Sequence, residues 1–144
     1  MNTNEQKMLQ ILKELKDNYN VFSVKAEFEA EGTRTDDLLR LCDLVRRSGL
    51  SLTIKIGGCE AISDMHQVKK YGAKCVIAPM IESGYALSKY VDAKNKIFNR
   101  EEQNEIEFLF NVGGEDKKNS SSWILKKWKY SSNNSKNGIY SKCR

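Results

Sequence analysis

A βα unit that recurs along residues 1–112 limits the folds open to this chain more than any other feature of its sequence. Runs of strand type begin near residues 21, 50, 75 and 106, and one helical stretch separates each run from the next. Strands separated by helices pair in parallel through crossover connections. The sequence therefore predicts an α/β protein with a parallel sheet.

The spacing of the apolar residues locates these elements. Apolar residues recur at helical spacing over 5–16, between Thr35 and Gly49, over 60–71 and over 84–94. Residues 21–28, 50–56, 75–81 and 106–112 are typical of strands. Residues 95–103 form a polar segment before the last strand.

Four βα units of this size fit two architectures, half of an eight-stranded barrel or a small open doubly wound sheet. A complete (β/α)8 TIM barrel needs on the order of 250 residues, and the chain has 144. A barrel architecture would therefore be partial here, with about four of its βα units.

A basic, low-complexity tail over residues 113–144 is expected to form a second region. It carries eight Lys or Arg residues against Glu115 and Asp116, and eleven of its residues are Ser or Asn. Such a composition predicts a disordered segment. Because the tail accounts for the positive net charge of +5, residues 1–112 are not expected to bind nucleic acid.

The remaining composition indicates a soluble cytoplasmic protein. There is no run of about 18 apolar residues, as a membrane span would need, and no basic segment leading into an apolar one at the N-terminus. The four cysteines form no C-x-x-C pair, and His66 is the only histidine. We therefore expect reduced thiols, no zinc site and no membrane partner.

Candidate functional residues cluster at the carboxyl ends of the predicted strands, where α/β proteins place their sites. The first strand ends in Glu27, Glu29 and Glu31. These carboxylates are candidates for a general base or a metal ligand. Alternatively, they are solvent-exposed residues at the end of the strand and have no chemical role. Lys55 lies in an otherwise apolar strand. It either faces those carboxylates, where it can hold an anionic substrate or stabilise an enolate, or lies on the solvent face of an edge strand.

Two further features complete this group. Gly57 and Gly58 precede a predicted helix, where free backbone N–H groups suit a phosphate or carboxylate. Glu82 follows the third strand.

Three motifs at these strand ends resemble the first half of the HpcH/HpaI aldolase/citrate lyase family. They are KAEFEAEGTRTDDLLRL, LTIKIGGCEAI and YGAKCVIAPMIESGYAL, in this order, and the resemblance covers roughly residues 20–112. The family consists of metal-dependent (β/α)8-barrel enzymes of the pyruvate-aldolase and CoA-ester-lyase type. The resemblance implies a carbon–carbon lyase that acts on a small keto acid, an aldehyde or an acyl-CoA.

The resemblance also implies roles for particular residues. Lys55 falls where the family commonly has arginine, so it is the expected catalytic and substrate-binding cation, although lysine lacks the bidentate fork. Glu29 or neighbouring Glu27 falls in the acidic strand-end motif. We expect Glu29 to act in catalysis and Glu27 to bind substrate. Gly57, Gly58 and Glu82 complete the expected substrate-binding set.

A divalent metal, Mg²⁺ or Mn²⁺, is the cofactor that the resemblance implies, but its ligands are not evident in this chain. The family places two metal carboxylates further along, whereas here residues 107–112 are followed by Gly113, Gly114 and the tail. We therefore expect an N-terminal half-barrel, a fragment truncated or frameshifted after about residue 112. Two alternatives remain open: a non-catalytic fragment that forms homo-oligomers through its exposed sheet edges, and a small α/β binding module with a basic tail.

Overall fold

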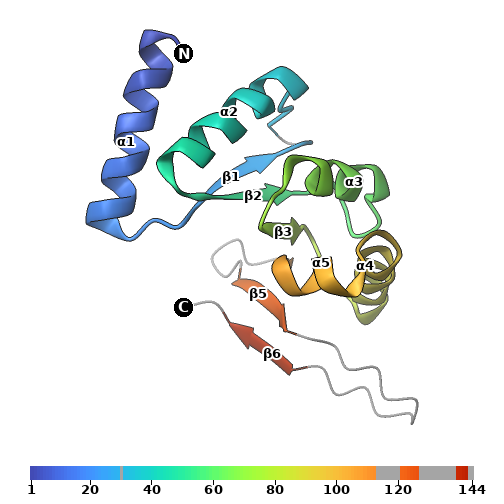
Figure 1. Cartoon of the computed structure of the whole chain (residues 1–144). Helices are drawn as coiled ribbons and strands as arrows, with labels where there is room; N and C mark the ends of the chain where they lie inside the picture. The colour runs from blue at the N-terminus through green and yellow to red at the C-terminus, as the bar shows by residue number, and fades with distance from the viewer. Residues whose placement is uncertain (30, 113–120, 127–138, 143–144) are drawn as a thin grey trace.

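The computed structural model describes residues 1–29, 31–112, 121–126 and 139–142. Helices separate successive strands over the first 112 residues, with two helices, rather than one, before the fourth strand (Figure 1). The helices are α1 (Thr3–Tyr19), α2 (Thr35–Ser48), α3 (Ile62–Tyr71), α4 (Gly84–Ile97) and α5 (Arg100–Glu105). The strands are β1 (Ser23–Glu27), β2 (Ser51–Lys55), β3 (Cys75–Ala78), β4 (Glu107–Val112), β5 (Ser121–Lys126) and β6 (Ile139–Lys142).

The six strands form one sheet in the order β1-β2-β3-β4-β5-β6. Strands β1 to β4 pair in parallel, and β5 and β6 add to β4 in antiparallel fashion. The predicted α/β class and the four parallel strands are therefore confirmed. Among the described strands the sheet is open, because β1 and β6 are not paired with each other.

The strand order of the parallel part has no reversal point. A doubly wound sheet needs a point at which the strand order reverses, and β1 to β4 follow one another without reversal. Crossovers between parallel strands are almost always right-handed. Successive crossovers in one direction therefore place their helices on the same face, so the parallel part of the sheet is singly wound.

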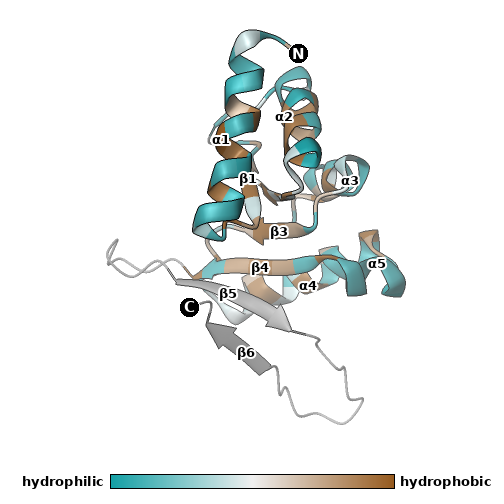
Figure 2. Cartoon of the chain, turned by 60° about the vertical axis from the view of Figure 1, so that its left-hand side comes forward, coloured by the Kyte–Doolittle hydropathy of each residue, from teal (hydrophilic) through white to brown (hydrophobic). Residues whose placement is uncertain are grey.

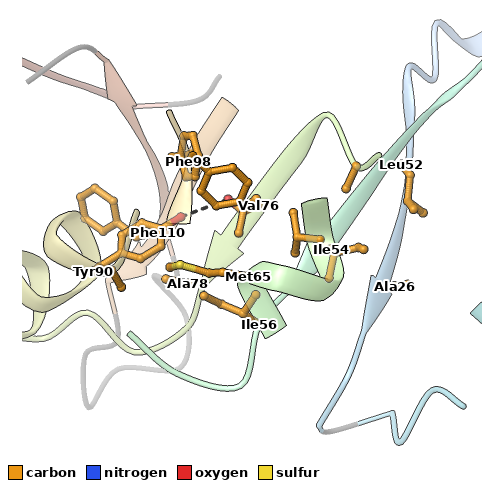
Figure 3. Close-up of a cluster of buried hydrophobic side chains, with 14 of the residues drawn as sticks. Ala26, Leu52, Ile54, Ile56, Met65, Val76, Ala78, Tyr90, Phe98 and Phe110 are labelled. Atoms are coloured by element: carbon orange, nitrogen blue, oxygen red, sulfur yellow. Dashed lines mark hydrogen bonds between the residues drawn. The ribbon is translucent and has the colours of Figure 1, made fainter. Parts of the chain in front are cut away.

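The hydrophobic core lies between that helix-bearing face and the helices (Figure 3). Register aligns Ala26 of β1, Ile54 of β2, Val76 of β3 and Phe108 of β4, and all four are buried. The Tyr90 hydroxyl of α4 donates to the Val76 carbonyl at 3.4 Å. The helix side of this core consists of Leu38 and Val45 from α2, Met65 and Val68 from α3, and Tyr90 and Val91 from α4.

The opposite sheet face is polar at β1 and β2. We call it the polar face and define it by Ser23, Lys25, Glu27, Thr53 and Lys55, which alternate with the core residues along the two strands. The Ser23 and Thr53 hydroxyls lie 2.5 Å apart. Because Glu27 and Lys55 are register partners at the carboxyl ends of β1 and β2, the fold itself brings them together.

Local sequence signals explain most helix ends. Gly49 and Gly72 adopt left-handed conformations where α2 and α3 end, as glycine does at helix C-termini. Helix α5 lies within the segment that the sequence analysis treats only as polar. Asn99 and Glu102 form a capping box there, with each side chain bonded to the other's backbone N–H.

The tail departs from the expectation of a disordered segment in two places. Residues 121–126 and 139–142 form β5 and β6, and Leu109 of β4 pairs in register with Ile124 of β5. The basic, Ser/Asn-rich stretches over 113–120, 127–138 and 143–144 lie outside the described residues. Antiparallel strands can be joined by a short connection without a crossover helix. The sequence before β5 and β6 therefore needs no helical pattern of apolar residues.

Helix α1 packs beside α2 and presents both polar and apolar residues (Figure 2). None of its residues is fully buried, and Met8 and Ile11 remain 46% and 54% exposed. Within the described part of the chain, α1 and the other helices are too short or too polar to cross a membrane.

Candidate functional site

A salt bridge between Lys55 and Glu27 forms the centre of the candidate site. The Lys55 Nζ donates to Glu27 Oε1 at 2.5 Å across the register pair. The two side chains are 23% and 10% exposed, so both are largely withdrawn from water. Strand β2 lies between β1 and β3, so Lys55 is not on an edge strand. Of the two alternatives for Lys55, the structure shows the one in which it faces a carboxylate of the first strand.

Lys25 adds a second cation to the same carboxylate. Its Nζ donates to Glu27 Oε2 at 3.2 Å and also lies 4.0 Å from the exposed Glu31. The Lys55 ammonium holds the pKa of the Glu27 carboxyl below its usual range, burial acts in the opposite direction, and Lys25 lowers it further. Glu27 is therefore an ionised acceptor at neutral pH and is not poised to act as a general base.

Gly57, directly beyond β2, lies against two further carboxylates. A methyl group in place of its α-hydrogen would lie 2.5 Å from Glu29 Oε2 and 3.3 Å from Asp64 Oδ2. The Gly57 N–H donates to Asp64 Oδ2 at 2.7 Å. The N–H that the sequence analysis offers to an anion is thus engaged by the first turn of α3, which begins at Ile62 rather than directly after the glycine pair.

Glu82 belongs to a different part of the structure. It lines a shallow depression of about 340 Å³ at the ends of β3 and β4, with Ser83, Leu87 and Phe110. Met80, just before it, has a left-handed backbone (φ 48°) and is 68% exposed. The structure places Glu82 beside an apolar surface and assigns it no contact with the Lys55–Glu27 pair.

The geometry at Lys55 suits a small carboxylate. An ammonium group has three donors, and one of them is given to Glu27. In the part of the chain that the structure describes, no hydrogen bond uses the other two, which leaves them for a second acceptor. The low exposure of Lys55 strengthens any charged hydrogen bond that it makes. Two cations within bonding distance of Glu27 also offset its charge. A cation so placed can bind a carboxylate or stabilise an enolate oxygen.

The described residues do not fit the divalent metal that the resemblance implies. In the described ranges, no three His, Cys, Asp or Glu side chains come together as a metal ion requires. Glu27 is engaged by two lysines, and Asp64 by the Gly57 N–H. No step of the chemistry below is therefore assigned to a metal.

The structure brings some of the predicted site residues together and separates others. Lys55 and Glu27 pair directly, and Glu29 lies beside Gly57. Sequence reasoning missed Lys25 and Asp64. The signal for Lys25 was its position two residues before Glu27, which places both on one strand face. The signal for Asp64 was its place in the first turn of a helix, where a carboxylate accepts from nearby N–H groups.

The chain was also compared with known proteins. No protein-family model, no curated protein and no solved structure matches it.

Proposed function

We propose that the chain is an N-terminal half-barrel related to the HpcH/HpaI aldolase/citrate lyase family, and that it binds the carboxylate of a small keto acid through Lys55. The observation that carries this proposal is the Lys55–Glu27 pair, which joins the carboxyl ends of two neighbouring parallel strands. Barrel enzymes place their substrate groups at these strand ends. The pair lies on the sheet face that a barrel turns inward.

The winding of the sheet supports the barrel part of the proposal. In a (β/α)8 barrel each strand is followed by a helix, and all helices lie on the outside. Strands β1 to β4 follow one another without reversal, and α2, α3 and α4 contribute to a single core with them. Four such units correspond to half of the eight in a barrel.

The side chains have separable roles in this proposal. Lys55 donates to the substrate carboxylate and to the oxygen that becomes negative when the carbon–carbon bond breaks. Glu27 accepts from the Lys55 ammonium and orients it. Glu29, which lies beside Gly57, is the group that we assign to exchange a proton with the substrate. Carbon–carbon cleavage in the family also uses a metal, so turnover requires ligands from outside the described residues.

Calorimetric titration with pyruvate tests the binding step. The full chain is expected to bind pyruvate, and Lys55→Met is expected to weaken binding by about tenfold or more, since a charge-assisted hydrogen bond contributes roughly 1.5–3 kcal/mol. Lys74→Met is the matched control. Lys74 is also ion-paired, with Glu105 at 3.2 Å, but it lies before β3, at the other end of the sheet.

The control ligand is acetone, which keeps the keto group and lacks the carboxylate. No binding of acetone is expected. Equal binding of pyruvate to the wild-type chain and to Lys55→Met would refute the proposal, as would an equal loss in Lys74→Met. A separate assay follows cleavage of a 4-hydroxy-2-oxo acid with Mg²⁺ or Mn²⁺, with and without the separately expressed C-terminal half of a lyase of this type. Turnover only with the added half is expected.

One observation favours a second candidate, a non-catalytic α/β binding module with a basic tail. Strand β5 pairs antiparallel to β4, on the edge where the next parallel strand of a barrel would pair. This reading predicts nucleic-acid binding that weakens with salt and is lost when residues 113–144 are deleted. Binding that survives the deletion would contradict it.

A further inference from the structure

The outer edge of β1 is a second surface of interest, and it shares Lys25 and Glu27 with the Lys55 site. Among the described strands, β1 has one neighbour, β2, and is an edge of the sheet. The Ser51 N–H donates to the Phe22 carbonyl, and the Phe28 N–H donates to the Lys55 carbonyl. Because backbone direction alternates along a strand, Ser23, Lys25 and Glu27 turn their N–H and C=O groups away from β2. These groups form a template for another strand.

The sequence of β1 complements itself when two copies run antiparallel. With Ala26 on a two-fold axis, Lys25 of one copy lies opposite Glu27 of the other, and the same pair recurs on the other side of the axis. The outward backbone groups of Lys25 and Glu27 then form the hydrogen-bonded pairs, and Ala26 faces Ala26 as a non-hydrogen-bonded pair. Opposite charges in directly opposed positions stabilise such a pair.

Side chains on the other face complement one another in the same register. Val24 lies opposite Phe28 of the second copy, and both are half-buried at the margin of the core. A register shifted to centre on Lys25 would instead place two lysines opposite each other, which is destabilising. The charges of β1 therefore select the Ala26-centred register. The Glu27 carbonyl also accepts from the Thr33 hydroxyl at 2.7 Å, and an oxygen with two lone pairs can accept a second donor.

Exposed apolar residues occur in the part of the chain that leads into this edge. Phe22, directly before β1, is 78% exposed, and Met8 and Ile11 of α1 are 46% and 54% exposed. A stable interface needs about 800 Å² from each partner, which is more than a short strand supplies. Phe22 adjoins β1 in the chain and supplies exposed apolar area at the start of the strand.

We propose that the β1 edge binds a second copy of this chain, in an antiparallel pair centred on Ala26, to form a two-fold dimer with a continuous sheet. The partner is a copy of the chain because the Lys25–Glu27 order is complementary to itself. A closing barrel strand would use the same edge, so the dimer and a completed barrel exclude each other.

Sedimentation of the full chain over a range of concentrations tests the dimer. The wild-type chain is expected to dimerise. Lys25→Pro removes an outward N–H and leaves the β1–β2 hydrogen bonds in place, so it is expected to raise the dimer Kd by about tenfold or more. Lys25→Glu places like charges opposite each other and is also expected to raise the dimer Kd. Lys70→Glu, on the exposed side of α3, makes the same charge change and is expected to leave the Kd unchanged.

Disulfide crosslinking tests the register. Cα atoms of a non-hydrogen-bonded antiparallel pair lie about 4.5 Å apart, within reach of a disulfide. Ala26→Cys is therefore expected to form a covalent dimer on mild oxidation, beyond the level of the wild-type chain with its own cysteines. Ser23→Cys, which has no self-contact in this register, is expected to form none. A wild-type chain that stays monomeric, or a dimer that persists in both Lys25 variants, overturns the proposal.

Discussion

At the scale of single residues, register decides which charges meet. The sequence places Glu27, Glu29 and Glu31 at one strand end and Lys55 at another, and a lysine in an apolar strand predicts a partner. Only the Glu27–Lys55 register shows which carboxylate it is. Glu29 lies beside Gly57 instead, and the Gly57 N–H is engaged by Asp64. The residue types of the site could be predicted from the sequence. Which of these residues pair could not, because that depends on the register of the strands in the sheet.

The Glu27 carboxylate is expected to make folding stability pH-dependent. Its folded pKa lies below the usual value of about 4.3, so its contribution is complete above that value and is lost as the pH falls through the folded pKa. Glu27→Gln is expected to lower the free energy of unfolding by about 2 kcal/mol at pH 7, because Lys55 loses its charged partner. Urea unfolding from pH 7 to pH 3 measures both effects.

The difference between the wild-type chain and Glu27→Gln is expected to shrink at low pH, where the wild-type carboxyl is protonated. Glu31→Gln is the control, because Glu31 is 52% exposed and lies 4.0 Å from Lys25. Its effect is expected to stay below about 0.5 kcal/mol. Equal effects of the two variants would show that burial of the Lys55–Glu27 pair does not matter.

Lys94 of α4 is expected to oppose folding. It is only 7% exposed, and its Nζ lies 5.2 Å from the centre of the Phe108 ring. Burial lowers its pKa. The unfolded chain therefore holds the proton more strongly, and the penalty for burying the charge falls as the pH rises through the folded pKa. Lys94→Met keeps an apolar contact with Phe108 and is expected to raise the free energy of unfolding by about 1 kcal/mol at pH 7.

The control for Lys94→Met is Lys96→Met, in the same helix at an exposed position. Thermal unfolding at pH 7 and at pH 10 compares the two variants. The gain from Lys94→Met is expected to be smaller at the higher pH. A loss of stability at pH 7 would mean that the attraction between the ammonium and the Phe108 ring exceeds the desolvation cost.

At the scale of elements, the spacing of apolar residues along the sequence predicted each helix that covers the sheet and each parallel strand. It missed α5, β5 and β6 for different reasons. Helix α5 is short and has no buried residue, so it leaves no apolar stripe, and its signal is the Asn99–Glu102 capping box. Strands β5 and β6 lie in a Ser/Asn-rich region whose composition favours disorder. Strand β5 forms by pairing with β4, and β6 by pairing with β5, and neither pairing is visible in the composition.

The N-terminus of α4 provides a prediction about a single element. The Ser83 hydroxyl accepts from the Ala86 N–H at 3.1 Å and caps the helix. Ser83→Ala is expected to lower the free energy of unfolding by about 1 kcal/mol in urea. Ser88→Ala removes an exposed hydroxyl that bonds within the helix and is expected to change stability by less. An equal effect would show that the cap contributes nothing specific.

At the scale of the whole molecule, the strand order carries the functional interpretation. Periodicity alone predicted βα units and could not order them, because each unit of a barrel and of a doubly wound sheet has the same pattern. The unreversed order of β1 to β4 makes the sheet singly wound and places Glu27 and Lys55 on the face away from the helices. We propose that this face binds a keto acid.

Titration of the isotopically labelled chain with pyruvate, followed by backbone amide NMR signals, tests that claim most directly. The expected result is a saturable shift of the Phe28, Ile56 and Gly57 signals, which border the Lys55–Glu27 pair, and its loss in Lys55→Met. The Lys74 signal, at the opposite end of the strands, is expected not to move. Saturable shifts that persist in Lys55→Met, or no shift at these strand ends, would contradict the account.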